Sequence, residues 1–400
     1  MSPPLIALFI AAFAFGTTEF VIAGVLPEVA EGLQVGVPTA GYLVSGYALG
    51  IAIGGPLLTI AAARVPRRTL IIALTLAFVV GQAACALAPN FLSMLAFRFA
   101  TAIAHGCFFG VAMVVAVGLV PPAARGRAVA VVLAGLTISN IVGVPAGTAI
   151  GNFWGWRSTF WAMFALGIVA AAAAATLLPR KAVPSSEPVG LATETRVLAR
   201  QQVWTSLIIM LMLMMAQFVP FTYITPMLRE VTHLSEDTVP WMLLLIGLGS
   251  TLGVFAGGKL ADGNLMRWLV VLLLVQAVSL LTVWLASPHA LQMAAALFVW
   301  GALSFSIGTA VQTRILAWTA DAPNLASSLI PSGFNIGIAL AASIGAMLLD
   351  AGYGYRSLPL VGVAAMVVGA GVALLSSAAE RRAGSTPPTA IGQAEAPGRC

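Results

Sequence analysis

Charged residues are scarce in this chain of 400 residues. Asp, Glu, Lys and Arg together make up 8% of it, whereas hydrophobic residues make up 60%. The charged fraction is about a third of that in an ordinary soluble domain. Long apolar runs continue from Leu5 almost to Ala379, so the chain has too few polar residues to maintain a water-facing surface. The composition excludes a soluble globular protein and predicts an all-α integral membrane protein.

Side chains that bind metals or perform catalysis are also few. The three cysteines, Cys85, Cys107 and Cys400, show neither metal-ligand spacing nor a disulfide framework. The three histidines are too scattered for a metal centre or a catalytic triad, which argues against an enzyme. No GxxxxGK loop is present, which argues against ATP as the energy source. No basic face interleaved with aromatics is present, so we expect no nucleic-acid partner.

Twelve apolar runs divide the chain, each near the ~20 residues that a helix needs to cross a bilayer. They span about 5–26, 39–61, 69–88, 91–119, 128–151, 158–178, 203–225, 239–258, 267–286, 290–318, 325–349 and 358–378. With both chain ends on one side of the membrane, that side holds 14 Lys and Arg residues in its loops and ends, against 3 on the other. By the positive-inside rule, both termini are predicted to be cytoplasmic.

Two polar segments lie outside this pattern. Residues 179–202 are predicted to form a cytoplasmic linker, and residues 380–400 a disordered cytoplasmic tail. The linker separates two halves of similar length, 1–178 and 203–379.

The two halves match each other at a single register. A gapless shift of 199 residues superposes several residues at loop edges: Pro27 on Pro226, Arg68 on Arg267, Pro89 on Pro288 and Arg157 on Arg356. Such coincidences indicate an internal duplication. They predict two pseudo-symmetric six-helix bundles with a binding cavity between them at the membrane midplane.

Short motifs resemble those of a known family. The loop GGPLLTIAAARVPRR resembles the loop between helices 2 and 3 of the major facilitator superfamily, although Ala63 stands where that family has an aspartate. The second-half counterpart, GGKLADG, keeps an acid at Asp262. The stretch FLSMLAFRFATAIAHG resembles the family's helix-4 arginine motif, with the arginine at Arg98. The resemblance implies the major facilitator fold with 12 transmembrane helices.

The resemblance also assigns two sets of site residues. Residues expected to gate the cytoplasmic loops are Arg64, Arg67, Arg68 and Asp262, although these arginines are equally explained as cytoplasmic anchors. In GLTISNIVGVPAGTAIG, the residues that match the signature of proton-coupled exporters are Gly143, Pro145, Gly147 and Gly151. Ordinary tight helix packing is an alternative explanation for these glycines.

A narrower resemblance covers nearly the whole chain. GTTEFVIAGVLP, WGWRSTFW and FNIGIALAASIGAMLLD resemble bacterial drug/proton antiporters that include chloramphenicol exporters and sugar efflux transporters. It implies a monomeric carrier in the bacterial cytoplasmic membrane that uses the proton gradient and no cofactor. The implied cargo is a small, largely uncharged drug, such as chloramphenicol, exported by alternating access. A sugar or nucleoside efflux carrier and a non-transporting membrane receptor are the alternatives.

Three ionisable residues lie within the apolar runs of the first half: Glu19, Arg98 and His105. Charge at the bilayer centre costs roughly 2.5–3.5 kcal/mol, so such residues are expected to face a cavity with partners. At 1.5 Å per residue, Glu19 lies about 22 Å from the cytoplasmic side and Arg98 about 12 Å from the outer side. Because the two distances are measured from opposite sides of a hydrocarbon core of ~30 Å, the two residues lie at similar depth. This predicts a Glu19–Arg98 pair. His105 is expected two turns deeper than Arg98, on the same face of its helix.

We therefore hypothesise that Glu19 carries the proton, binding it when the cavity excludes water and releasing it when water or Arg98 approaches. A static pair that only fixes two helices is the alternative. His105 is either a relay or a histidine that bonds to a neighbouring backbone group.

Neutral polar and aromatic residues are candidates for the wall of the cavity. The candidates are Phe15, Phe20, Phe109, Asn140, Gln217, Phe221, Tyr223, Gln312 and Asn335. Each is also explained by helix packing or by hydrogen bonds between helices. Arg314, toward the cytoplasmic end of its helix, is expected to extend to the membrane surface and is not assigned to the cargo.

Overall fold

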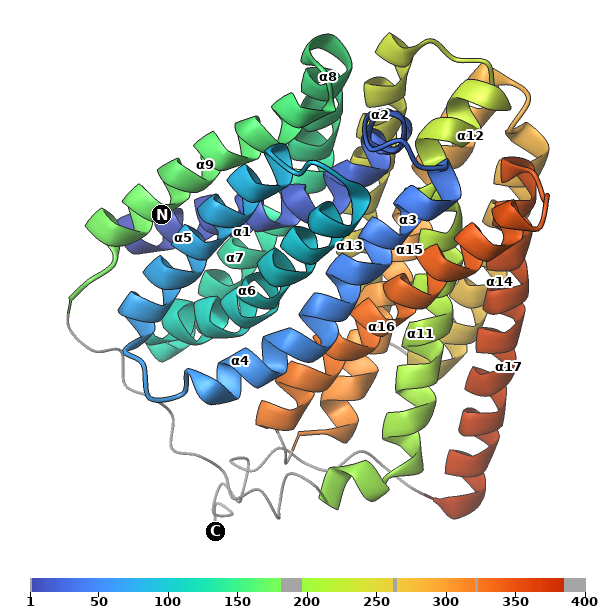
Figure 1. Ribbon diagram of the computed structural model, residues 1–400. Helices are drawn as coiled ribbons and strands as arrows, with labels where there is room; N and C mark the ends of the chain where they lie inside the picture. Colours follow the sequence, from blue (N-terminus) through green and yellow to red (C-terminus); the bar gives the residue numbers. More distant parts are fainter. Residues whose placement is uncertain (1, 181–195, 262–264, 321–322, 385–400) are drawn as a thin grey trace.

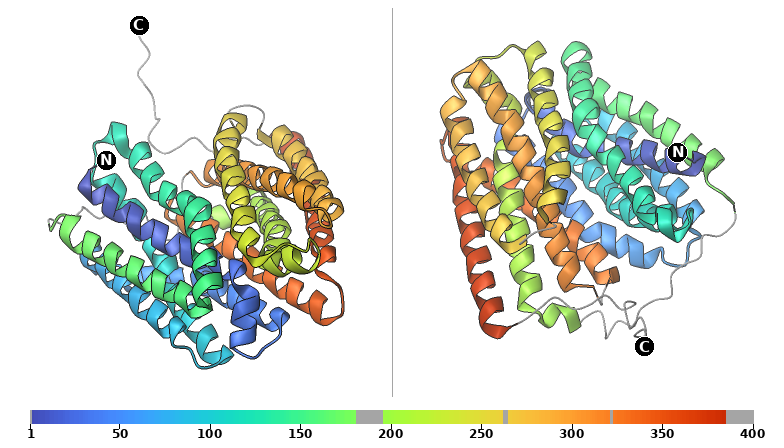
Figure 2. Two further views of the ribbon diagram at one scale, coloured as in Figure 1. Left: turned by 90° about the horizontal axis from the view of Figure 1, so that it is seen from above. Right: turned by 180° about the vertical axis from the view of Figure 1, so that it is seen from behind.

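The computed structural model describes residues 2–180, 196–261, 265–320 and 323–384, and the regular structure in these residues is entirely helical. Within them, 12 spans are long and apolar enough to cross a membrane (Figure 1). The first half of the chain, coloured blue to green, and the second half, coloured yellow to red, form two bundles (Figure 2). The structure confirms the predicted twelve-helix, two-bundle architecture.

Within residues 2–180, the first bundle contains nine α-helices, some of which are parts of one span. They are α1 (Pro3–Gly24), α2 (Leu26–Gly32), α3 (Val37–Leu49), α4 (Gly55–Ala61), α5 (Arg67–Ala86), α6 (Phe91–Gly118), α7 (Arg125–Ile138), α8 (Val144–Trp154) and α9 (Trp156–Leu177).

The second bundle repeats this plan. Its helices are α11 (Gln201–Thr222), α12 (Ile224–Glu230), α13 (Val239–Ala261), α14 (Leu265–Ala286), α15 (Ala290–Trp318), α16 (Pro323–Asp350) and α17 (Leu358–Ala383). The predicted tail thus begins inside α17, and most of the predicted linker lies outside the described residues.

Close helix contacts recur at the same shift that relates the two halves of the sequence. Gly50 lies against the carbonyl of Phe99, and Gly249 lies against the carbonyl of Phe298, 199 residues further on in each case. In both pairs a side chain larger than hydrogen would collide with the neighbouring helix backbone. The repeat in the sequence is therefore a repeat in packing.

Two spans of the first bundle contain a π-helical segment just before a proline. Gly50–Gly54 leads into α4 ahead of Pro56, and Ser139–Gly143 leads into α8 ahead of Pro145. Proline has no N–H, and its ring clashes with the carbonyl one turn earlier, so the helix widens locally to i→i+5 bonding. These segments are points at which the two spans can bend.

Both π segments contact the second bundle. The Ser332 hydroxyl donates to the carbonyl of Ala52 at 2.9 Å. Gly247 of α13 lies against the backbone of Asn140, at a distance that leaves no room for a side chain. The bends of the first bundle are thus part of its interface with the second.

The bundles also meet at the helix ends that lie away from the predicted cytoplasmic side. There the Thr225 hydroxyl donates to the carbonyl of Ala23 at 2.8 Å. Arg229 of the second bundle forms ion pairs with Glu28 of the first bundle and with Glu236, the latter at 3.2 Å. These contacts hold the two bundles together on that side of the molecule.

Candidate functional site

A buried carboxylate lies where the two bundles meet. Glu19 is on α1, and its side chain is 10% exposed. It borders a cavity of about 10 Å³, close to the volume needed for one water molecule. The other residues around this cavity come from both bundles: Phe20, Val44, Tyr47, Ala48, Phe218 and Ile338.

Among the described residues, His105 on α6 lies within ion-pairing distance of Glu19. Its Nε2 lies 3.7 Å from the Glu19 Oε2, and its Nδ1 lies 2.9 Å from the Tyr47 hydroxyl. The rings of Phe15 and Phe109 pack on the imidazole with centroid separations of 5.3 and 5.1 Å. These aromatic rings shield the imidazole and leave its two nitrogens facing Tyr47 and Glu19.

Arg98 adjoins this group through Tyr47. Its guanidinium lies over the Tyr47 ring, 4.6 Å from the centroid, and its Nε donates to the carbonyl of Leu43 at 3.2 Å. Its Nη2 is buried without a hydrogen-bond partner among the described residues. The predicted Glu19–Arg98 pair is not among the described ion pairs, because Glu19 points to His105 and Arg98 points to Tyr47.

The four side chains form a continuous series: Glu19, His105, Tyr47 and Arg98. If the Tyr47 hydroxyl donates to Nδ1, the neutral imidazole carries its proton on Nε2, directed toward Glu19. The 3.7 Å separation is longer than a hydrogen bond, so proton transfer between Glu19 and His105 requires the pair to approach further or to share a water molecule.

The second bundle has no charge at the corresponding positions. The residues 199 positions after Glu19, Tyr47, Arg98 and His105 are Phe218, Ile246, Leu297 and Ser304. Phe218 also borders the small cavity, across from Glu19. The site thus has an ionisable wall from the first bundle and an apolar wall from the second.

The glycines of the predicted antiporter motif position α1. Gly143, Gly147 and Gly151 lie one turn apart on α8 and the π segment before it. They pack against residues spaced in the same way: Thr17 and Val21 of α1, and Val25 directly after it. Glycines at this spacing let two helix backbones approach closely. The motif therefore sets the position of the helix that carries Glu19.

We expect Gly147→Ala to destabilise the protein by about 1–3 kcal/mol, since inserting a methyl group into a packed interface causes strain. The added Cβ would lie 2.5 Å from Val21 Cγ2, and the short branched valine has little freedom to move away. Thermal unfolding in detergent measures the effect. Gly110→Ala is the matched control, because its Cβ would meet nothing within 4 Å. Equal stability of the two variants would contradict the proposed role of the motif.

Some of the predicted cavity residues come together and others do not. The rings of Phe20 and Phe221 gather around Phe218, with centroid separations of 5.8 and 5.5 Å from it. Phe15 and Phe109 lie instead against His105 inside the first bundle.

The predicted polar residues of the cavity have other partners. Gln217 accepts from Ser304, and the side-chain amide of Asn335 donates to the carbonyl of Pro331. The side chain of Asn140 donates to its own helix, the Tyr223 hydroxyl donates to the carbonyl of Ala342, and Gln312 is exposed. The bonds of Gln217 and Tyr223 therefore connect different helices in this conformation, whereas those of Asn140 and Asn335 reach only the preceding turn of their own span.

The predicted gating arginines differ in their surroundings. Arg68 donates to the carbonyls of Leu178 and Ala175 at the end of α9, where a cation offsets the helix dipole. Arg64 is exposed and Arg67 is half-buried. Asp262 lies outside the described residues. In this conformation Arg68 acts within the first bundle.

Comparison with known proteins identifies the family of this two-bundle chain. The Major Facilitator Superfamily model matches residues 8–316. The chain belongs to the major facilitator superfamily. It is 38% identical over 372 residues to the inner membrane transport protein YdhP of Escherichia coli K12, which covers 93% of this chain and 94% of that protein.

Other relatives of this superfamily member include a resistance protein. The chain is 33% identical over 351 residues to the chloramphenicol resistance protein of Streptomyces lividans, which covers 87% of this chain and 90% of that protein. The crystal structure of a bacterial homologue of the human lysosomal transporter Spinster has the same fold. Its TM-score is 0.77 at 19% identity, covering 96% of this chain and 98% of that one.

Membership establishes a multi-pass membrane transporter of the major facilitator type. Among the described residues, no group of three or more His, Cys, Asp or Glu side chains could hold a metal ion. The site described above contains the ionisable series from Glu19 to Arg98.

Proposed function

We propose that the protein is a proton-coupled exporter of a small, largely uncharged drug, with a chloramphenicol-like compound as the first candidate. The observation that supports coupling most directly is the buried Glu19 carboxylate beside His105, at a cavity bordered by both bundles. The similarity to the Streptomyces lividans chloramphenicol resistance protein supports the cargo class.

Proton coupling follows from the cost of charge at this depth. An ionised side chain near the bilayer centre costs roughly 2.5–3.5 kcal/mol, so adding or removing a proton at Glu19 changes the relative stability of the closed and hydrated cavity. His105 and Tyr47 provide nearby exchange partners. When the cavity opens outward, the drug leaves and a proton binds at Glu19. When the bundles rock and the cavity opens to the cytoplasm, the proton leaves and the next drug molecule binds.

A neutral cargo fits the second wall of the site. Phe20, Phe218 and Phe221 offer aromatic surface, and binding sites combine such surface with few polar groups. Among the residues of the second half that the structure describes, every Asp and Glu before Glu380 lies at the end of a helix or between spans. A cationic drug would lack a second buried acid there, whereas an uncharged drug needs none.

The test is a panel of phenicols, sugars, nucleosides and cationic dyes, applied to a bacterial host that lacks its own exporters. Wild-type protein is expected to raise the inhibitory concentration of the phenicols several-fold, and Glu19→Gln is expected to abolish that protection. The matched control is Glu31→Gln, an exposed carboxylate on α2. If the protein protects the host only against sugars or nucleosides, the proposed phenicol cargo is wrong and that class takes its place.

Counterflow of labelled drug in proteoliposomes separates a transporter from a receptor. Exchange of labelled for unlabelled drug across the membrane is expected for the wild type. Saturable binding without exchange would contradict the proposed export.

A further inference from the structure

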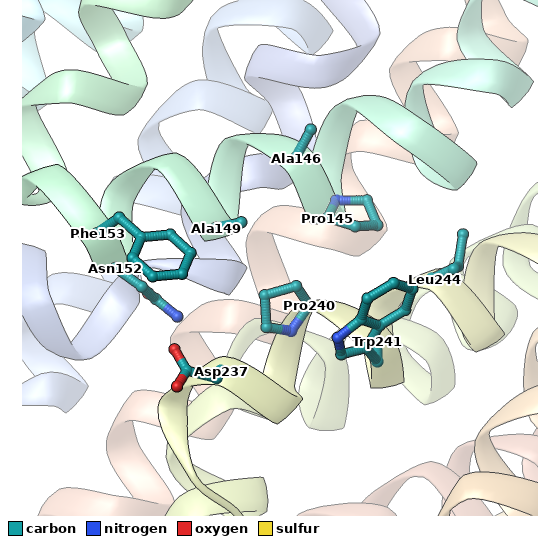
Figure 3. A pocket seen from close by; sticks show the side chains of 9 residues that line it. All are labelled: Pro145, Ala146, Ala149, Asn152, Phe153, Asp237, Pro240, Trp241 and Leu244. Carbon is teal, nitrogen blue, oxygen red and sulfur yellow. The ribbon is translucent and has the colours of Figure 1, made fainter.

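A second cavity, far larger than the one at Glu19, lies between the two bundles. Its volume is about 390 Å³, within the range of small-molecule sites (Figure 3). Its walls are almost wholly apolar and come from α8 on one side and α13 on the other: Pro145, Ala146 and Ala149, and Pro240, Trp241 and Leu244. Neither Glu19 nor His105 borders it.

The cavity is a groove bordered by exposed aromatic side chains. Phe153 and Trp241, which border it, are 70% and 67% exposed, and Trp154 beside it is 75% exposed. These aromatics lie at the helix ends away from the predicted cytoplasmic side, where aromatic belts meet the lipid headgroups. Acyl chains of the surrounding bilayer therefore have direct access to the groove.

One end of the groove is polar and carries a carboxylate and a side-chain amide. Figure 3 shows the side chains of Asn152 and Asp237 facing one another there. The Asn152 amide nitrogen donates to the carbonyl of Glu236 at 2.9 Å, while its Oδ1 is buried without a hydrogen-bond partner among the described residues. Asp237 is exposed, and the described residues show no ion pair to it. A ligand with N–H donors and a positive charge complements the Asn152 Oδ1 and the Asp237 carboxylate at this end.

We propose that the groove binds a membrane phospholipid whose headgroup is a primary ammonium, as in phosphatidylethanolamine. The ammonium has three N–H donors for Asp237 and Asn152, whereas the quaternary headgroup of phosphatidylcholine has none. The acyl chain lies along the apolar walls between Pro145 and Trp241. Because these walls belong to different bundles, the bound lipid stabilises the arrangement of α8 and α13 described here.

The proposal is tested by native mass spectrometry of the full chain released from nanodiscs that contain equal amounts of phosphatidylethanolamine and phosphatidylcholine with identical acyl chains. We expect preferential retention of one phosphatidylethanolamine molecule. Monomethyl and dimethyl derivatives should be retained progressively less, because each methyl group removes one N–H donor. Equal retention of all four lipids, or of none, would overturn the proposal.

Two variants locate the lipid. Asp237→Asn should lower the preference for phosphatidylethanolamine about two- to fivefold, the value of a partly exposed ion pair. Ala146→Phe should remove the retained lipid by filling the groove, and Asp350→Asn, an exposed acid with no place in the groove, should change nothing.

A carboxylate just before α13 is also favoured by the helix dipole alone. Asp237→Asn could lower thermal stability equally in both lipids without changing the lipid preference. In that case Asp237 stabilises the start of α13 rather than a lipid, and the proposal fails. If a cationic amphiphile but no phospholipid occupies the groove, it is a drug site instead, and the proposal again fails. Neither outcome depends on whether the protein transports chloramphenicol.

Discussion

Glu19→Gln is expected to abolish proton-driven accumulation of drug while leaving drug exchange intact. In vesicles with a gradient of one pH unit, each proton supplies about 1.4 kcal/mol, enough for about tenfold accumulation at one proton per drug molecule. The variant should reduce this accumulation ratio to one. Labelled chloramphenicol in proteoliposomes, with and without an imposed pH gradient, measures both quantities.

The physical reason is that glutamine preserves the shape of glutamate but cannot ionise. The amide can still face His105 and fill its place beside the small cavity, so the bundles can rock with drug bound. The side chain is fixed in a neutral form, however, and no proton crosses with each cycle. Exchange should also lose its dependence on pH, because the titrating group that controls the cycle is gone.

Retained exchange shows that the variant has folded and still binds drug. Glu31→Gln, which removes an exposed carboxylate, should behave as the wild type. Gradient-driven accumulation by Glu19→Gln with an unchanged pH dependence would exclude Glu19 as the proton carrier.

Hydropathy and charge were enough to predict the spans of this protein but not their interruptions. The predicted span 5–26 corresponds to α1, and 128–151 corresponds to α7 and α8 together. The π segments before Pro56 and Pro145 were not predicted, because apolar composition does not distinguish i→i+4 from i→i+5 bonding. The glycine and proline residues at both places were the available signal.

The sequence predicts which charged residues form the candidate site, but not which side chains they contact. Counting residues along a helix gives the depth of Glu19 and Arg98 but does not fix the direction in which each side chain points. The structure turns Glu19 toward His105 and places Tyr47 between the imidazole and Arg98. Tyr47 was missed because a tyrosine in an apolar span costs little and carries no charge. Its hydroxyl, which needs a partner when buried, was the signal.

Arg314 is a further residue whose surroundings differ from expectation. It was expected to extend to the membrane surface, but it is 3% exposed. The predicted final span ended at residue 378, whereas α17 continues to Ala383 and places Glu380 within reach. A buried partner contributed by a longer helix cannot be inferred from the arginine's own neighbourhood in the sequence.

Glu380→Ala is expected to destabilise the second bundle by about 3–5 kcal/mol, the cost of leaving a buried charge unpaired. Arg314 forms an ion pair with Glu380 and donates to the hydroxyls of Ser206 and Ser376, both at 2.8 Å. These partners belong to α11 and α17, so one guanidinium ties three helices together. A lower midpoint of thermal unfolding in detergent measures the loss.

The ion pair between Arg314 and Glu380 is expected to affect stability because each charge compensates the other, not because either charge is stabilising alone. Arg314→Leu combined with Glu380→Leu should recover much of the stability, since an apolar replacement of a buried pair leaves no uncompensated charge. Arg381→Ala, an exposed cation one residue along α17, should change the stability by no more than about 0.5 kcal/mol. A double variant as unstable as Glu380→Ala would mean that the hydrogen bonds to Ser206 and Ser376, rather than the unpaired charge, account for the loss.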